Sequence, residues 1–159
     1  ENNIKIISQS FVENKRDIDH IRKYICEING DLKSIKLLSK IETNLGVDNF
    51  KEIIRYSDGI IIARGDLIPE CGLINSVDKE FDLLLKVKKY EKEKEVIIAT
   101  HILDNMRKGI IPNINELESI YTFVNLGVTG FLLASETSIG NYPVKSVEML
   151  KMLINLYKK

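Results

Sequence analysis

The sequence has 159 residues, 44% of them hydrophobic and 29% charged, with 23 Lys and Arg balanced by 23 Asp and Glu. A chain of this length buries one substantial core, so we expect a single domain over residues 1–159. The even charge balance gives no electrostatic footprint for nucleic acid, and no apolar stretch approaches the roughly 20 residues of a membrane helix. We therefore expect neither a nucleic-acid nor a membrane partner.

Short β-rich runs alternate with amphipathic stretches along the whole chain. Strands are predicted at residues 4–7, 35–41, 59–63, 96–100 and 130–134. Helices are predicted from about Asp17 to Gly30, around 47–54, along 77–85, at 102–106, along 117–127 and from Pro143. The third strand is almost wholly apolar, which is typical of a strand buried on both faces.

This alternation predicts an α/β fold with a parallel sheet and helical crossovers. About five such units are too few to close an eight-stranded barrel. An open doubly wound sheet and a partial barrel both fit the periodicity. No Gly-x-Gly-x-x-Gly or Walker-type loop follows any strand, which disfavours a nucleotide-binding Rossmann domain.

Polar residues gather where the predicted strands end. They are Ser10, Lys40, Glu42, Asp66, Thr100, Glu136 and Thr137. In parallel α/β folds the carboxyl ends of the strands form the active face, so these residues are expected to converge there. The alternative, that they are ordinary solvated or turn-capping residues, stays open on pattern alone.

Glu42 and Asp66 end successive strands, and neighbouring strands lie about 5 Å apart. Two carboxylates that close repel unless a cation lies between them, and hard oxygen ligands suit magnesium or manganese. Lys40, two residues before Glu42, points to the same side of its strand. A lysine beside a metal-bound carboxylate pair could offset the charge of a phosphate or an enolate.

Two segments, Ser39 to Val47 and Ser57 to Leu67, resemble the signature segments of the pyruvate kinase family in sequence and spacing. Weaker matches lie along the rest of the chain, at Ser10-Phe11, Ala99-Thr100, Met106, Glu136-Thr137 and Gly140 to Pro143. The resemblance implies the second half of a TIM-type (β/α)8 barrel. Residues 1–159 would then be a partial catalytic domain, without the first barrel strands, the lid domain and the C-terminal domain.

The resemblance also implies roles for individual residues. Lys40 would be a catalytic and substrate-binding residue that stabilises the phosphoryl group in flight. Glu42 and Asp66 would bind Mg²⁺ or Mn²⁺. The backbone amides of Gly65 and Asp66 and the hydroxyl of Thr100, also counted as catalytic, would position the substrate carboxylate. These roles agree with the positioning and charge neutralisation that phosphoryl transfer requires.

The chain departs from the family pattern at several places. Ile68-Pro69 follows Leu67 where glycine is usual, and Ala134-Ser135 stands before the Glu-Thr pair in place of Ser-Gly. His101 replaces a glutamine, and we expect it to take that residue's place as a hydrogen-bonding neighbour, with a catalytic role as the alternative. The polar run expected between Pro112 and Gly127 has drifted, which bears on nucleotide handling and subunit contacts.

The resemblance implies transfer of phosphate from phosphoenolpyruvate to ADP, a step of glycolysis, in the full-length protein. Potassium is implied too, with ligands outside this chain, so we expect the chain alone to be inactive. Two alternatives stay open, a metal-dependent aldolase or lyase of the phosphoenolpyruvate/pyruvate barrel group and a non-catalytic homologue. We expect a homo-oligomer, a tetramer by resemblance. The expected compartment is the cytoplasm, with a plastid isoform as the alternative, and Cys26 and Cys71 are expected to be reduced.

Overall fold

The computed structural model describes residues 4–29, 35–91 and 93–158. The predicted end of the first helix at Gly30 lies outside these residues. The chain divides into two compact units, residues 1–96 and 97–159. Each unit has its own strands, helices and core.

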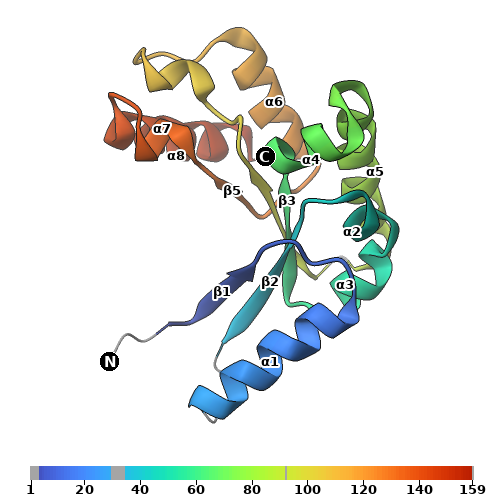
Figure 1. Cartoon of the computed structure of the whole chain (residues 1–159). Helices are drawn as coiled ribbons and strands as arrows, with labels where there is room; N and C mark the ends of the chain where they lie inside the picture. Colours follow the sequence, from blue (N-terminus) through green and yellow to red (C-terminus); the bar gives the residue numbers. More distant parts are fainter. Residues whose placement is uncertain (1–3, 30–34, 92, 159) are drawn as a thin grey trace. The chain divides into compact units, whose positions relative to one another are not determined.

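The first unit contains three parallel strands, each followed by helices (Figure 1). The strands are β1 (Ile6–Gln9), β2 (Lys36–Ile41) and β3 (Gly59–Ala63). In their register Ile6 pairs with Lys36 and Lys40 pairs with Ile61. All residues of β3 are buried, as its apolar sequence predicts.

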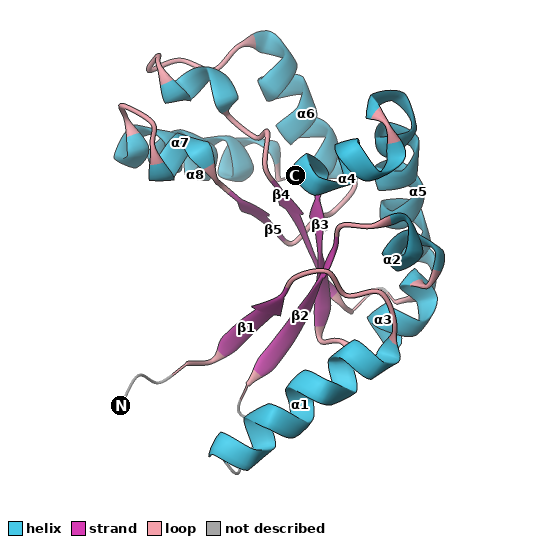
Figure 2. Ribbon diagram, in the orientation of Figure 1, coloured by secondary structure: helices cyan, strands magenta, loops and turns pink. Residues whose placement is uncertain are grey.

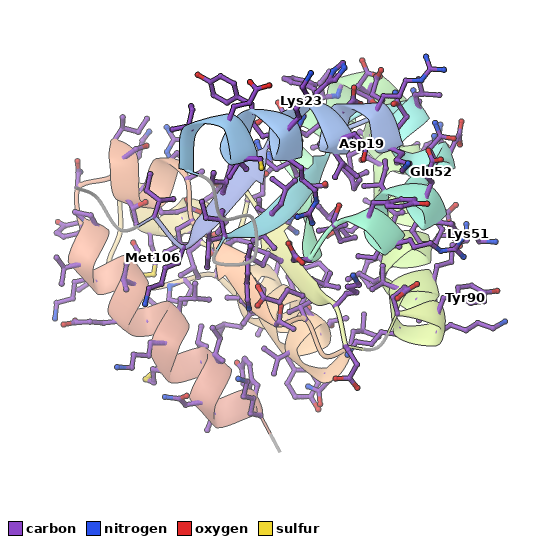
Figure 3. The ribbon with its side chains drawn as sticks, turned by 90° about the horizontal axis from the view of Figure 1, so that it is seen from below. Asp19, Lys23, Lys51, Glu52, Tyr90 and Met106 are labelled. Carbon is purple, nitrogen blue, oxygen red and sulfur yellow. The ribbon has the colours of Figure 1, made fainter. Side chains whose placement is uncertain are left out.

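Helices pack against these strands in the first unit (Figure 2). They are α1 (Lys15–Asn29), α2 (Asn44–Asp48), α3 (Phe50–Tyr56), α4 (Arg64–Cys71) and α5 (Leu73–Tyr90). The pattern around 47–54 predicted one helix where the structure has two, α2 and α3. Fully buried side chains of this core include Ile18, Leu37, Ile41, Ile53, Ile60, Ile62, Leu67 and Leu83. On the outer surface, Lys51 Nζ lies 5.3 Å from the ring centroid of Tyr90 (Figure 3).

The predicted helix at 77–85 is confirmed as part of α5, although two residues that mark it are exposed. Val77 is 51% exposed and Leu85 58%. The buried positions are Ser76, Glu80, Leu83, Leu84 and Val87. Steps of three and four residues put these positions on one helix face. Because a serine and a glutamate occupy two of them, hydrophobicity alone does not reveal this face.

The second unit contains the end of β4 (Glu95–Ala99) and β5 (Gly130–Leu132), which run parallel with Ile97 opposite Gly130. Its helices are η1 (Asp104–Arg107), α6 (Ile114–Asn125), α7 (Ser135–Ser138) and α8 (Pro143–Tyr157). A capping box between Asn113 and Glu116 begins α6. β4 keeps the predicted length but begins and ends one residue earlier than predicted, whereas β5 ends at Leu132, two residues before its predicted end. The parallel strands and intervening helices of the two units confirm the predicted α/β class.

Within residues 4–29, 35–91 and 93–158, no helix combines the length and the apolar character needed to span a membrane.

Candidate active site

Lys40 and Glu42 lie at the carboxyl end of β2, and their side chains are paired. Lys40 Nζ forms an ion pair with Glu42 Oε1 and donates a hydrogen bond to Ser10 Oγ at 3.1 Å. The pairing agrees with the two-residue spacing, which places both side chains on one side of the strand. The first unit therefore brings these three predicted strand-end residues together.

Glu42 is almost wholly buried, with 1% of its side chain exposed. A buried carboxylate is tolerated when it is paired and hydrogen-bonded. Besides Lys40, Glu42 has the backbone of Phe11, whose N–H donates to Oε2 at 2.6 Å. Phe11 has a φ of 53°, a left-handed conformation that is uncommon for a bulky residue. Sequence reasoning missed this contact, because a backbone donor can belong to any residue type.

Asp66 lies in the first turn of α4, directly after β3. Burial raises the pKa of the Asp66 carboxyl above its ordinary value, and the charge of Glu42 and a hydrogen bond with Glu42 raise it further, while Lys40 lowers it. The carboxyl groups of Glu42 and Asp66 are therefore neighbours, as predicted. Gly65 and Asp66 lie at the start of α4, where the helix dipole favours an anion.

The donor set suits a small divalent cation. The charge of Glu42 disfavours the ionised form of Asp66, and a cation between two ionised carboxylates would relieve their repulsion. Two carboxylates also leave positions for water and substrate oxygens, as magnesium and manganese sites usually do. Among the described residues no group of three or more His, Cys, Asp or Glu could hold a metal.

A second buried carboxyl stands next to this region. Glu80 of α5 lies with Oε1 at 3.8 Å from Nε of Arg64, the first residue of α4. Within the described part of the chain, this oxygen has no hydrogen-bond partner. The pKa of Glu80 is about 7, because burial raises it by more than the charge of Arg64 lowers it. The helical spacing of Glu80 with the buried positions of α5 is the signal that sequence reasoning overlooked.

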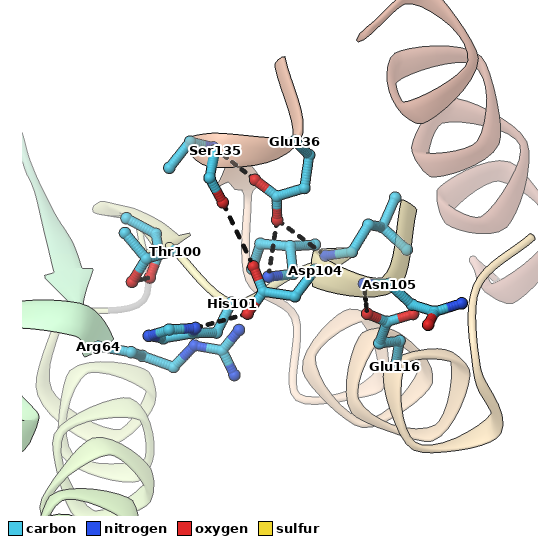
Figure 4. A network of polar contacts seen from close by, with 12 residues as sticks. Arg64, Thr100, His101, Asp104, Asn105, Glu116, Ser135 and Glu136 are labelled. Carbon is cyan, nitrogen blue, oxygen red and sulfur yellow. Dashed lines mark hydrogen bonds and ion pairs between the residues drawn. The ribbon is translucent and has the colours of Figure 1, made fainter. Parts of the chain in front are cut away.

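Thr100 follows β4 in the second unit. Its Oγ1 donates to the Ala99 carbonyl at 2.6 Å. Both Thr100 and His101 are left-handed, with φ of 65° and 52°. The ring Nδ1 of His101 lies at 2.6 Å from Asp104 Oδ2 (Figure 4). The convergence of Thr100 with the residues of the first unit stays a prediction.

Comparison with known proteins agrees with the sequence resemblance. The family model described as "Pyruvate kinase, barrel domain" matches residues 1–147. Proteins named pyruvate kinase are similar over nearly the whole chain. One from Methanocaldococcus jannaschii is 36% identical over 94% of this chain and 32% of its own length. Another, from Chlamydia muridarum, is 33% identical over 100% of this chain and 32% of its own. The chain thus spans about a third of the length of these curated relatives.

Proposed function

Because the chain belongs to the pyruvate kinase family, in the part that forms its barrel domain, we propose that the complete protein transfers the phosphoryl group of phosphoenolpyruvate to ADP. The products would be pyruvate and ATP. We propose residues 1–159 as part of the catalytic barrel, with Lys40, Glu42 and Asp66 at its active end. The single observation that carries the proposal is the Lys40–Glu42 ion pair with the Asp66 carboxyl beside it.

Lys40 is proposed to stabilise the phosphoryl group in flight. During transfer the bond between phosphorus and the enolate oxygen breaks, and a bond to an oxygen of the ADP β-phosphate forms. Negative charge spreads over the peripheral phosphoryl oxygens, and a positioned ammonium lowers its energy. The enolate then takes up a proton to give pyruvate.

Glu42 and Asp66 are proposed to hold Mg²⁺ or Mn²⁺, which would neutralise charge on the substrate oxygens. The N–H groups of Gly65 and Asp66, at the start of α4, are proposed to receive the substrate carboxylate together with the hydroxyl of Thr100. In each case the chain supplies orientation and charge, and forms no covalent intermediate.

The remaining parts of the proposal concern the whole protein. Potassium is proposed as a further cofactor with ligands outside this chain, so residues 1–159 alone should give only background pyruvate. A homo-oligomer, a tetramer by family, and a cytoplasmic location, with an organellar alternative, complete the proposal. Since the relatives above are all named pyruvate kinase, nothing favours the aldolase or lyase alternative.

The test is an assay of the purified complete protein with phosphoenolpyruvate, ADP, magnesium and potassium. Pyruvate should form only when ADP is present, and ATP should form in equal amount. Pyruvate formation independent of ADP would contradict a kinase. A folded protein that binds phosphoenolpyruvate and gives neither product would favour the non-catalytic homologue.

A further inference from the structure

Glu136 is a fully buried carboxylate that accepts hydrogen bonds from the backbone of two segments. Its Oε1 accepts the N–H groups of Ile102 and Leu103 at 3.2 and 3.0 Å, and its Oε2 accepts the N–H of Ala134 at 2.8 Å (Figure 4). None of its side chain is exposed. Both oxygens are therefore occupied by donors of this unit, and the carboxylate is turned inward, away from any ligand in solution.

The loop that Glu136 holds contains two consecutive left-handed residues. Thr100 and His101 have φ of 65° and 52°, and neither is glycine. A β-branched residue in this region is strained, and such strain persists only where the surrounding structure enforces it. Strained backbone of this kind gathers at functional sites, which directs attention to what enforces it here.

The strained pair is attached on both sides to the segment around β5 and α7. Before the turn, the N–H of Thr100 donates to the Leu132 carbonyl at 3.2 Å. After the turn, the N–H groups of Ile102 and Leu103 donate hydrogen bonds to Glu136 Oε1. Without the second attachment, the backbone could relax toward negative φ and carry the Thr100 hydroxyl with it.

We propose that Glu136 is a positioning residue that holds the Thr100–His101 turn left-handed and thereby aims the Thr100 hydroxyl at the substrate carboxylate. The second half of this statement rests on the proposed function, while the first half concerns the backbone alone. Glu136 acts through Thr100 and does not touch the substrate.

The test compares Glu136→Gln with Glu116→Gln in the complete protein. Glu116 is a matched control, because it is also buried and its carboxylate also accepts backbone N–H groups, those of Asn105 at 2.7 Å and Asn113 at 2.8 Å. Hydrogen exchange at Ile102 and Leu103 should quicken at least about tenfold in Glu136→Gln alone, because glutamine has one acceptor oxygen for two sets of N–H groups and repulsion between its NH2 group and the Ala134 N–H displaces the side chain. The kcat/KM for phosphoenolpyruvate should fall about 10- to 100-fold in that variant and stay within about twofold in the control.

A double-mutant cycle separates positioning from general destabilisation. In a Thr100→Ala background, Glu136→Gln should lower kcat/KM by less than about twofold, because the group that it positions is gone. Adding His101→Gly should restore part of the loss in Glu136→Gln, and should rescue folding if that variant is unstable, since glycine adopts left-handed φ without strain. Equal losses in both glutamine variants, or full additivity with Thr100→Ala, would overturn the proposal.

If the unsubstituted protein lacks turnover, the proposed function and the substrate half of the proposal fail together. Exchange at Ile102 and Leu103 then decides the backbone half, which unchanged rates would overturn.

Discussion

Lys40 Nζ pairs with Oε1 of Glu42, yet the two side chains differ in exposure, at 20% for Lys40 and 1% for Glu42. The buried partner depends on the pair for stability, because an unpaired buried carboxylate is costly. The more exposed partner, Lys40, is the one proposed to meet the phosphoryl oxygens. Stability and turnover should therefore respond separately to changes around this pair.

Replacing Asp66 by Asn should weaken the proposed metal site. The change removes one of two anionic oxygen donors and keeps the side-chain shape, so the magnesium concentration for half-maximal activity should rise at least about tenfold. Magnesium dependence of turnover and Mn²⁺ binding by electron paramagnetic resonance would both report it in the complete protein. Asp78→Asn, at an exposed position of α5, is the control. Equal metal dependence in the two variants would remove Asp66 from the site.

Glu80 should make stability depend on pH. Its pKa lies at about 7 in the folded chain, above its ordinary value of 4.5. Between these two values the folded state holds a proton that the unfolded state has lost, so this group lowers stability as pH rises from about 4.5 to 7. Glutamine cannot ionise, and Glu80→Gln should gain up to about 3 kcal/mol in unfolding free energy over the original chain between pH 5 and pH 8.

Urea unfolding of the chain at the two pH values measures this difference. Glu148→Gln is the control, because Glu148 is 61% exposed in its ion pair with Lys145. If the two variants show the same pH dependence, Glu80 does not titrate in this range.

Gly59 begins β3 at a place with no room for a side chain. A Cβ there would lie 2.6 Å from the Glu95 carbonyl oxygen and 2.9 Å from Leu38 Cδ2. Because a backbone atom cannot move aside cheaply, Gly59→Ala should destabilise the chain by about 1–3 kcal/mol. Gly130→Ala is the matched control, since its Cβ would meet only Ile97 Cγ1 at an ordinary 3.6 Å. Similar urea midpoints for the two variants would contradict this account.

Much of the fold could be predicted because the apolar residues of buried strands and helices recur at regular spacings in the sequence. The apolar run of β3 gave its boundaries correctly at 59–63, since every residue of that strand is buried. The pattern predicts the first strand at 4–7, whereas β1 lies at Ile6–Gln9. Ser8 and Gln9 extend it without any apolar signal, so pattern alone stops too early there.

Some contacts of the candidate site could be predicted from the sequence and others could not. The proximity of Lys40, Glu42 and Asp66 follows from side-chain chemistry at the ends of neighbouring parallel strands, and it could be predicted. The N–H of Phe11 on Glu42 and the three N–H groups on Glu136 could not, because backbone donors are common to nearly all residues. Such contacts depend on backbone φ values, which cannot be predicted from the residue type.

Turnover of the complete protein carrying Lys40→Met tests whether the Lys40 ammonium stabilises the phosphoryl group during transfer. Methionine keeps an apolar stem and removes the charge proposed to meet the phosphoryl group. An interaction made mainly in the transition state should therefore lower kcat by about 10² to 10⁴, with little change in the KM for phosphoenolpyruvate. Lys36→Met is the matched control on the same strand, because Lys36 is 56% exposed and pairs with Glu95. Lys36→Met should keep the kcat of the unsubstituted enzyme. A folded Lys40→Met protein with the kcat of the unsubstituted enzyme would contradict the account.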